Sequence, residues 1–139
     1  AYEPAGSRMH VITFSENRRL LDDCYNAGPP SMAASLRVLG ASGGKKAAVI
    51  GDMAELGELT ERAHKEIGEL TKELGIGTVI AIGARAKYFT EGNPSAQWFG
   101  SVDEAMGAVK AAFTAETAML VKASHSMHFE KIVEELTKA

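Results

Sequence analysis

The sequence predicts a single α/β domain built on a mixed, mostly parallel sheet. Short apolar runs rich in Val, Ile and Leu alternate with longer segments whose apolar residues recur at helical spacing, which is typical of parallel sheets covered by helices. The 139 residues are 45% hydrophobic, which is enough for one core of common size. No internal repeat or low-complexity tract divides the chain, so residues 1–139 are expected to form one domain.

Six short runs are the expected strands, and the first two are expected to form a hairpin. Glu16 and Asn17 are turn-forming residues between these two runs, and the strands of a hairpin are antiparallel. The other runs have the composition of buried parallel strands, so one antiparallel strand is expected at an edge of the sheet. The runs are residues 9–14, 19–21, 47–50, 79–82, 97–99 and 119–121.

Helices are expected between and after these strands. Pro30 tolerates the first turn of a helix and Ser31 can cap one, so a helix is expected to begin there. Three later segments each place four apolar residues on one helical stripe. The stripes are Ala63, Ile67, Leu70 and Leu74; Val102, Met106, Val109 and Phe113; and Phe129, Ile132, Val133 and Leu136.

Composition excludes several classes of partner. The formal net charge is −3 and the charges are evenly mixed, so neither nucleic acid nor an anionic membrane surface is an expected partner. The apolar runs are far shorter than the roughly 20 residues that a membrane-spanning helix needs. The lone Cys24 fits a reducing compartment, which favours the cytoplasm. Because the chain begins with Ala1 rather than Met, we expect a piece of a longer protein.

Three polar loops follow expected strands at their carboxyl ends: residues 22–31, 51–57 and 122–126. Ligands of open parallel sheets bind outside these ends, so the loops predict one side of a binding site. In the first loop a carboxylate could accept hydrogen bonds from a ribose, and Asn26 could contact a base or backbone. The structural alternative is a turn in which Asp and Asn bond their own backbone.

The second and third loops are open to similar alternatives. Asp52 and Glu55 have the spacing of a capping box at the start of a short helix, and a metal or acid/base role is the alternative. Lys122 lies where a strand becomes a helix, so its ammonium and the free amides of the helix start could hold a phosphate or carboxylate. An ordinary serine cap beside a solvated lysine is the alternative. The serines and histidine of this loop are Ser124, Ser126 and His125.

The chain holds incomplete versions of metal-binding and phosphate-binding motifs. His125 and His128 lie three residues apart and Glu61 precedes His64 by three, but no second half completes a metal-binding pattern, so no metal site is expected. The glycine-rich "LGASGGKKAAV" and "GIGTVIAIG" both precede strands and lack required positions of the phosphate-binding and dinucleotide-binding motifs. No triphosphate cradle is therefore expected in this chain.

Taken together, "LLDDCYNAGPPSMAASL", "VIGDMAELGELTERAHKEIG" and "LVKASHSMHFEKIVEEL" resemble the carboxyl-terminal domain of the Mur ligases. The resemblance covers nearly the whole chain. It implies a Rossmann-like three-layer sandwich with a six-stranded sheet, in which residues 1–15 form the linker and first strand that follow the central domain. Within the family, "GDMAELG" favours the branch that adds D-alanyl-D-alanine to UDP-N-acetylmuramoyl-tripeptide.

The resemblance also implies a reaction and the other parts of the enzyme. ATP phosphorylates the terminal carboxylate of the UDP-linked tripeptide, and the amine of the dipeptide attacks the acyl phosphate. An amino-terminal domain holds the UDP-linked substrate, and a central domain holds most of the ATP and Mg²⁺. The third domain closes over both, which implies that this chain carries no catalytic residue of its own and is inactive alone.

Residue roles follow from the same resemblance. Arg8 is similar to the linker arginine that reaches the ATP phosphates, and Asp23 to the carboxylate that meets the ribose. Asn26 and Ser31 would lie beside the nucleotide and the incoming dipeptide. The residues implied to receive the dipeptide are Lys122, Ser124, His125 and Ser126.

The chain departs from the family pattern at three positions within these motifs. Gly28 lacks an expected amide side chain, Ala123 stands for a glycine, and His125 stands for an arginine. Arginine offers a permanent bidentate fork to a carboxylate and histidine does not, so dipeptide affinity or specificity is expected to differ. Two alternatives stay open at this point: a stand-alone nucleotide-binding or regulatory module, and the third domain of a related ligase of the diaminopimelate or folylpolyglutamate type.

Overall fold

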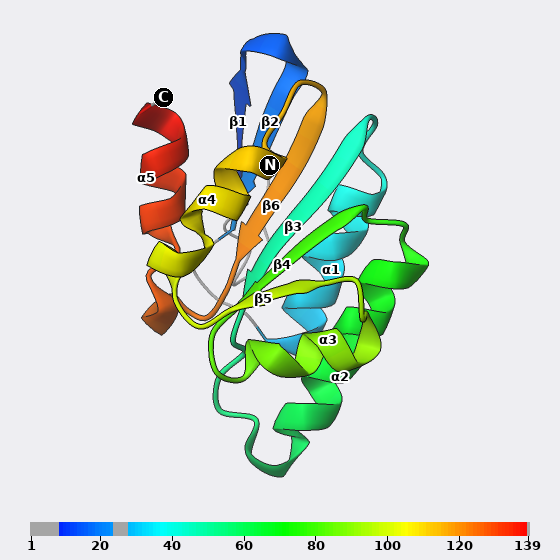
Figure 1. The fold of residues 1–139 in the computed structure, drawn as a ribbon. Coiled ribbons are helices and arrows are strands. Elements are labelled where there is room, and N and C mark those ends of the chain that lie inside the picture. The colour runs from blue at the N-terminus through cyan, green and yellow to red at the C-terminus, as the bar shows by residue number, and fades with distance from the viewer. Residues whose placement is uncertain (1–8, 24–27, 139) are drawn as a thin grey trace, which may run out of the picture.

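The protein is described here by a computed structural model that places residues 9–23 and 28–138. Its centre is a six-stranded sheet of order β1-β2-β6-β3-β4-β5, drawn in Figure 1. β1 pairs with β2 antiparallel at one edge, and all other pairs are parallel. The strands are β1 His10–Phe14, β2 Arg18–Asp22, β3 Lys45–Gly51, β4 Thr78–Ile82, β5 Gln97–Phe99 and β6 Thr117–Lys122. The expected mixed sheet with an antiparallel edge strand is confirmed.

The hairpin between β1 and β2 turns through the short 3-10 segment η1, Ser15–Asn17. Glu16 and Asn17 both have positive φ angles, 63° and 54°, which lets the two strands leave the turn side by side. Phe14 pairs with Arg18 directly across the turn. The guanidinium carbon of Arg18 lies 5.4 Å from the centre of the Phe14 ring, a cation–π contact across the turn.

Helices cover both faces of the sheet, as Figure 1 shows. On one face lie α1 Pro29–Gly40, α2 Thr60–Glu73 and α3 Phe89–Gly92. On the other lie α4 Val102–Ala112 and α5 Glu130–Lys138. Neighbouring residues of β2 point to opposite faces of the sheet and belong to different hydrophobic cores. Leu21 packs with Met32 and Leu36 of α1. Leu20 packs with Val109 of α4 and Ile132 of α5. The expected three-layer sandwich is therefore confirmed.

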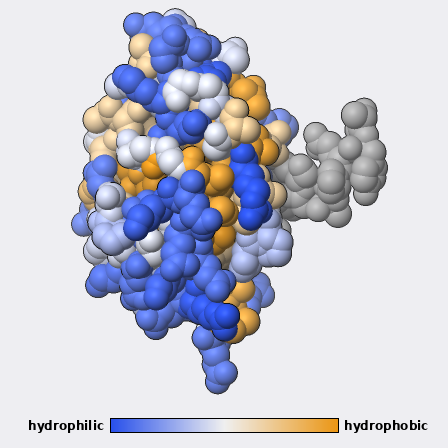
Figure 2. Space-filling model, turned by 90° about the vertical axis from the view of Figure 1, so that its right-hand side faces the viewer, coloured by the Kyte–Doolittle hydropathy of each residue, from blue (hydrophilic) through white to orange (hydrophobic). Residues whose placement is uncertain are grey.

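The outer surface of the α2 and α3 layer is mainly hydrophilic (Figure 2). This agrees with the predicted stripe of α2, whose charged residues face outward while Ile67 is buried. In the residues that the structure describes, none of the helices has the length and apolar character needed to cross a membrane.

Short helical segments were not anticipated from the sequence. They are η3 Ala86–Tyr88, α3 and η4 His125–Met127, whereas η2 Gly57–Leu59 begins later than the short helix expected from Asp52. Segments of three or four residues are too short to show a 3.6-residue period. α3 is nevertheless tightly packed on α2, because Gly68 and Gly92 let the two backbones approach: a Cβ added at Gly68 would lie 2.1 Å from the carbonyl oxygen of Phe89.

Candidate functional site

The three polar loops meet at one edge of the sheet. They follow β2, β3 and β6, and β6 lies between the other two, so all three loops start side by side. The backbone N–H of Asp23 donates to the carbonyl of Val121 at 3.0 Å, and the N–H of Ser124 donates to the carbonyl of Asp52 at 3.0 Å. Residues 22–23, 51–57 and 122–126 therefore form one rim at this edge of the sheet, which confirms the expectation for the described part of the three loops.

Asp23 and Lys122 form a buried ion pair at this rim. The Nζ of Lys122 lies 2.6 Å from Oδ2 of Asp23, and their side chains are 0% and 5% exposed. The hydroxyl of Ser35, the seventh residue of α1, donates to the same Oδ2 at 2.7 Å. The other carboxylate oxygen, Oδ1, is buried and has no hydrogen-bond partner within residues 9–23 and 28–138.

This geometry corrects the expectation for Lys122. The sequence left two alternatives open, an ammonium that faces a bound anion beside a helix start and a solvated lysine. The solvated lysine is wrong, because the side chain is fully buried. The Lys122 side chain is enclosed between neighbouring elements, and a buried ammonium needs a close counter-charge, which Asp23 supplies. The start of α5 does not follow directly either, because η4 and the left-handed residue His128 intervene and the Ser124 amide is bound to Asp52.

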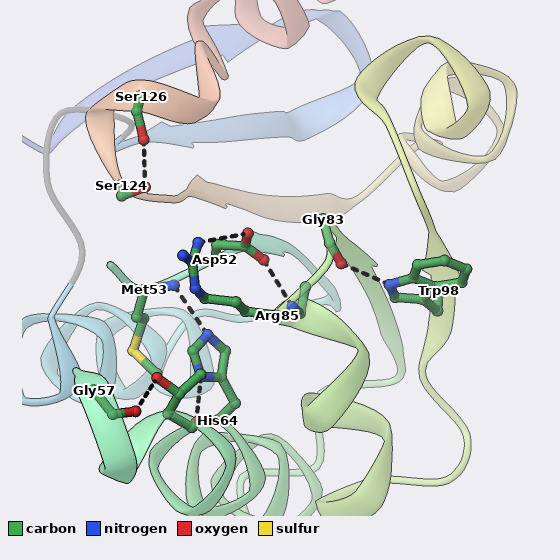
Figure 3. A network of polar contacts seen from close by, with 11 residues as sticks. Asp52, Met53, Gly57, His64, Gly83, Arg85, Trp98, Ser124 and Ser126 are labelled. Atoms are coloured by element: carbon green, nitrogen blue, oxygen red, sulfur yellow. Dashed lines mark hydrogen bonds and ion pairs between the residues drawn. The ribbon is translucent and has the colours of Figure 1, made fainter. Parts of the chain in front are cut away.

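Asp52 joins the ends of three strands, and Figure 3 shows its ion pair with Arg85. Its Oδ1 accepts from the backbone N–H of Ala86 at 2.7 Å, and its Oδ2 lies 3.5 Å from Nη1 of Arg85. Its own carbonyl accepts from Ser124. Asp52 follows β3, Arg85 follows β4 and Ser124 follows β6, so one residue ties the three loops together.

The capping box predicted for Asp52 and Glu55 is wrong. The first helical segment after β3 is η2, which has Leu56 at its N-cap position, and Glu55 has a φ of 61°. Residues 52–54 form neither strand nor helix, and the Asp52 carboxylate contacts η3 across the sheet edge. It caps a helical segment more than thirty residues away.

His64 binds the backbone of the second loop, residues 51–57, at Met53 (Figure 3). Its Nε2 accepts from the backbone N–H of Met53 at 3.0 Å, and its Nδ1 lies 2.6 Å from the Thr60 carbonyl, which requires the proton on Nδ1. The ring is 0% exposed and packs 4.9 Å from the ring of Phe89. Burial lowers its pKa, outweighing the hydrogen bond to Thr60 and the nearby carboxylate of Asp52. His64 is a neutral structural residue.

A fourth loop, residues 83–87, completes the rim and was not singled out in the sequence. The indole Nε1 of Trp98 donates to the Gly83 carbonyl at 2.8 Å, and the Lys87 ammonium lies 5.1 Å from the Trp98 ring centre. Gly83 has a φ of 121°, and an added Cβ would lie 2.5 Å from Oδ1 of Asp52. Arg85 follows β4 at its carboxyl end, so the rule that selected the other three loops was also the signal for this one.

The remaining predicted residues lie as follows. Ser31 is half-buried in the first turn of α1, which begins at Pro29 with Gly28 at the N-cap position, so the expected serine cap is wrong while proline in the first turn is confirmed. The hydroxyls of Ser124 and Ser126 lie 3.2 Å apart, and Ser126 and His125 are exposed. Arg8 and Asn26 lie outside the described residues.

Comparisons with known proteins agree with one another. Residues 7–125 match the family model described as Mur ligase, glutamate ligase domain. The chain is 34% identical over 131 residues to the UDP-N-acetylmuramoyl-tripeptide–D-alanyl-D-alanine ligase of Escherichia coli K12, covering 93% of this chain and 29% of that protein. Against the ligase of the same name from Bacillus subtilis it is 31% identical over 142 residues, covering 96% of this chain and 31% of that one.

Solved structures give the same result. A crystal structure of MurF from Acinetobacter baumannii superposes with a TM-score of 0.87 at 29% identity, covering 100% of this chain and 31% of that chain. MurF from Thermotoga maritima in complex with ADP superposes with a TM-score of 0.78 at 25% identity, covering 92% and 30%. The chain thus spans about three tenths of the length of the relatives that it matches.

Proposed function

Because this chain belongs to the Mur ligase, glutamate ligase domain family, we propose that it is the carboxyl-terminal domain of an ATP-dependent ligase that joins D-alanyl-D-alanine to UDP-N-acetylmuramoyl-tripeptide. The observation that carries the proposal is the joining of the family's three motif segments at one sheet edge, through Asp23, Asp52 and Ser124. The matched relatives named for this reaction support the choice of acceptor.

In the proposed reaction ATP transfers its γ-phosphoryl group to the tripeptide carboxylate. The amine of D-alanyl-D-alanine then attacks that carbonyl carbon, and phosphate leaves as the amide forms. Positioning and charge stabilisation carry most of such chemistry, and the polar rim of this domain is one wall of the cleft in which it takes place. The amino-terminal and central domains of the same enzyme supply the opposite wall, including the groups that hold the triphosphate and Mg²⁺.

The rim divides into a nucleotide side and an acceptor side in this proposal. Asp23, with a buried oxygen that lacks a donor among the described residues, suits a hydroxyl such as those of ribose, and Arg8 and Asn26 are proposed beside it. Ser31, Ser124, His125 and Ser126 are proposed to receive the dipeptide. The hydroxyls of Ser124 and Ser126 and the exposed ring of His125 can donate to a carboxylate.

The proposal is tested by product formation. The full-length ligase that carries this chain should form the amide from ATP, UDP-N-acetylmuramoyl-tripeptide and D-alanyl-D-alanine, and should do so poorly with diaminopimelate or glutamate as acceptor. The isolated chain should form none, because it holds one wall of the cleft. Steady turnover by the isolated chain, or preference for another acceptor, would contradict the proposal.

A further inference from the structure

The carboxylate of Asp23 is held in an asymmetric way. One oxygen, Oδ2, receives two donors: the Lys122 ammonium at 2.6 Å and the Ser35 hydroxyl at 2.7 Å. The other oxygen, Oδ1, is buried without a partner in the described part of the chain. Buried carboxylate oxygens seldom lack a hydrogen-bond donor. An unsatisfied Oδ1 at a ligand-binding rim therefore indicates an acceptor for a hydrogen bond from a ligand.

The two donors come from different elements and fix the carboxylate from two directions. Lys122 is the last residue of β6, in the strand next to β2, and Ser35 lies in α1 on one face of the sheet. A carboxylate that is bound at a single oxygen by two converging donors cannot rotate freely about its Cβ–Cγ bond. The direction in which Oδ1 points is therefore set by Lys122 and Ser35.

We infer that Lys122 and Ser35 are positioning residues that act through Asp23 and present its Oδ1 to a hydroxyl of the bound nucleotide. The inference rests on the proposed function and places Lys122 on the nucleotide side, although the family resemblance implied that it receives the dipeptide. It also gives a role to Ser35, which the sequence patterns did not indicate.

Binding of the dipeptide by Lys122 would require the ion pair to open. The Lys122 side chain is fully buried, and withdrawing its ammonium would leave the Asp23 carboxylate buried without a counter-charge. Removing one partner of a buried pair is strongly unfavourable, whereas a ligand that fills Oδ1 leaves the pair intact. The geometry therefore favours a role for Lys122 in positioning Asp23 over direct contact of Lys122 with the dipeptide.

The test compares Michaelis constants in the full-length ligase. Ser35→Ala and Lys122→Met should each raise the KM for ATP by about tenfold, the scale of one hydrogen bond to a charged group, and leave the KM for D-alanyl-D-alanine unchanged. Ser42→Ala is the matched control, since Ser42 follows α1 and its hydroxyl donates to the Val38 carbonyl; it should change neither constant. Calorimetry with ADP should show the same loss of affinity in the two variants.

A double-mutant cycle separates a positioning role from a purely structural one. If Lys122 acts through Asp23, then Lys122→Met should add nothing to the KM for ATP once Asp23→Asn is present. The double variant also carries no unpaired buried charge. If Lys122→Met does not fold alone, Ser35→Ala and the double variant decide the outcome by the same measurements.

Two results would overturn the inference: a raised KM for the dipeptide with an unchanged KM for ATP, or unchanged constants for both substrates in folded variants. Failure of the proposed function can be told apart from failure of this inference. If the proposed function is wrong, the unsubstituted enzyme itself forms no amide with D-alanyl-D-alanine. In that case the ADP affinities of the same variants still test whether Lys122 and Ser35 position Asp23.

Discussion

At the scale of single residues, the rim depends on side chains that bond across chain segments distant in sequence. Asp52 uses all three of its acceptor groups, two carboxylate oxygens and one carbonyl, to bind residues of two other loops. Arg85 is half-exposed while Asp52 is buried, so the hydrogen bond to the Ala86 amide contributes more than the ion pair does.

Removing the Asp52 carboxylate should destabilise the domain. Asp52→Ala leaves the buried N–H of Ala86 without an acceptor, so the free energy of unfolding should fall by about 1–3 kcal/mol. Asp52→Asn keeps one acceptor oxygen and should cost less. Urea unfolding followed by circular dichroism measures both, and equal losses in the two variants would contradict the cap.

His64 should make stability depend on pH in a defined window. Its pKa is lowered in the folded state, so the unfolded chain binds the proton more readily. The contribution is fully present above the unfolded-state pKa, near 6.5, and is lost as the pH falls below it toward the lower folded-state pKa. Protonation would turn Nε2 into a donor facing the Met53 N–H donor.

Urea unfolding between pH 7 and pH 5 measures this dependence. The free energy of unfolding should fall on acidification, with a slope of at most about 1.4 kcal/mol per pH unit from this residue. His64→Gln should flatten the curve, and His10→Gln, at an exposed position in β1, is the control that should leave it unchanged. A slope that survives His64→Gln would assign the effect to other groups.

At the scale of elements, the close pair of α2 and α3 supports the second and fourth loops. α2 begins just after η2, and η3 with α3 follows the Arg85 segment, so their packing sets how these loops sit against each other. Phe89 of α3 also packs on His64 of α2, which links the helix contact to the loop that His64 holds.

Two glycine substitutions in helices should have opposite effects. In Gly68→Ala the new Cβ would lie 2.1 Å from the Phe89 carbonyl oxygen, so α3 must move and about 1–3 kcal/mol should be lost. Gly107→Ala, in the middle of α4, meets no heavy atom within 4 Å and should stabilise by about 0.5–1 kcal/mol through helix propensity. Thermal unfolding compares the two, and a neutral Gly68→Ala would contradict the tight contact.

At the scale of the whole molecule, the fold presents one polar wall. Among the described residues, the proposed nucleotide and acceptor groups follow β2 and β6, beside the loops of Asp52 and Arg85 that follow β3 and β4. The sheet itself is covered on both faces. An open wall makes few simultaneous contacts with a small ligand, so affinity depends on closure against a second surface.

The isolated chain should accordingly bind ATP weakly. Calorimetry should give a dissociation constant weaker than the micromolar range, and the full-length ligase should bind more tightly because its central domain holds the triphosphate. Micromolar binding by the isolated chain would favour a stand-alone nucleotide-binding module instead.

The sequence by itself determined the elements and the place of the rim. Strand composition, helical stripes and turn residues depend on neighbours within a few positions, so six strands, the hairpin, the main helices and the polar strand-end loops could be predicted. The contacts of the side chains at the strand ends could not be predicted. Asp23 and Lys122 are 99 residues apart in the sequence, and they meet only because β6 lies between β2 and β3.

Only the tertiary structure decided that Lys122 is buried, that Ser35 bonds Asp23, and that Asp52 caps η3 rather than its own helix. The physical reason is that hydrogen bonds and ion pairs depend on three-dimensional distance and on exclusion of water. Both are set by strand order and layer packing, whereas local sequence patterns report only on each segment's own backbone preference and apolar face.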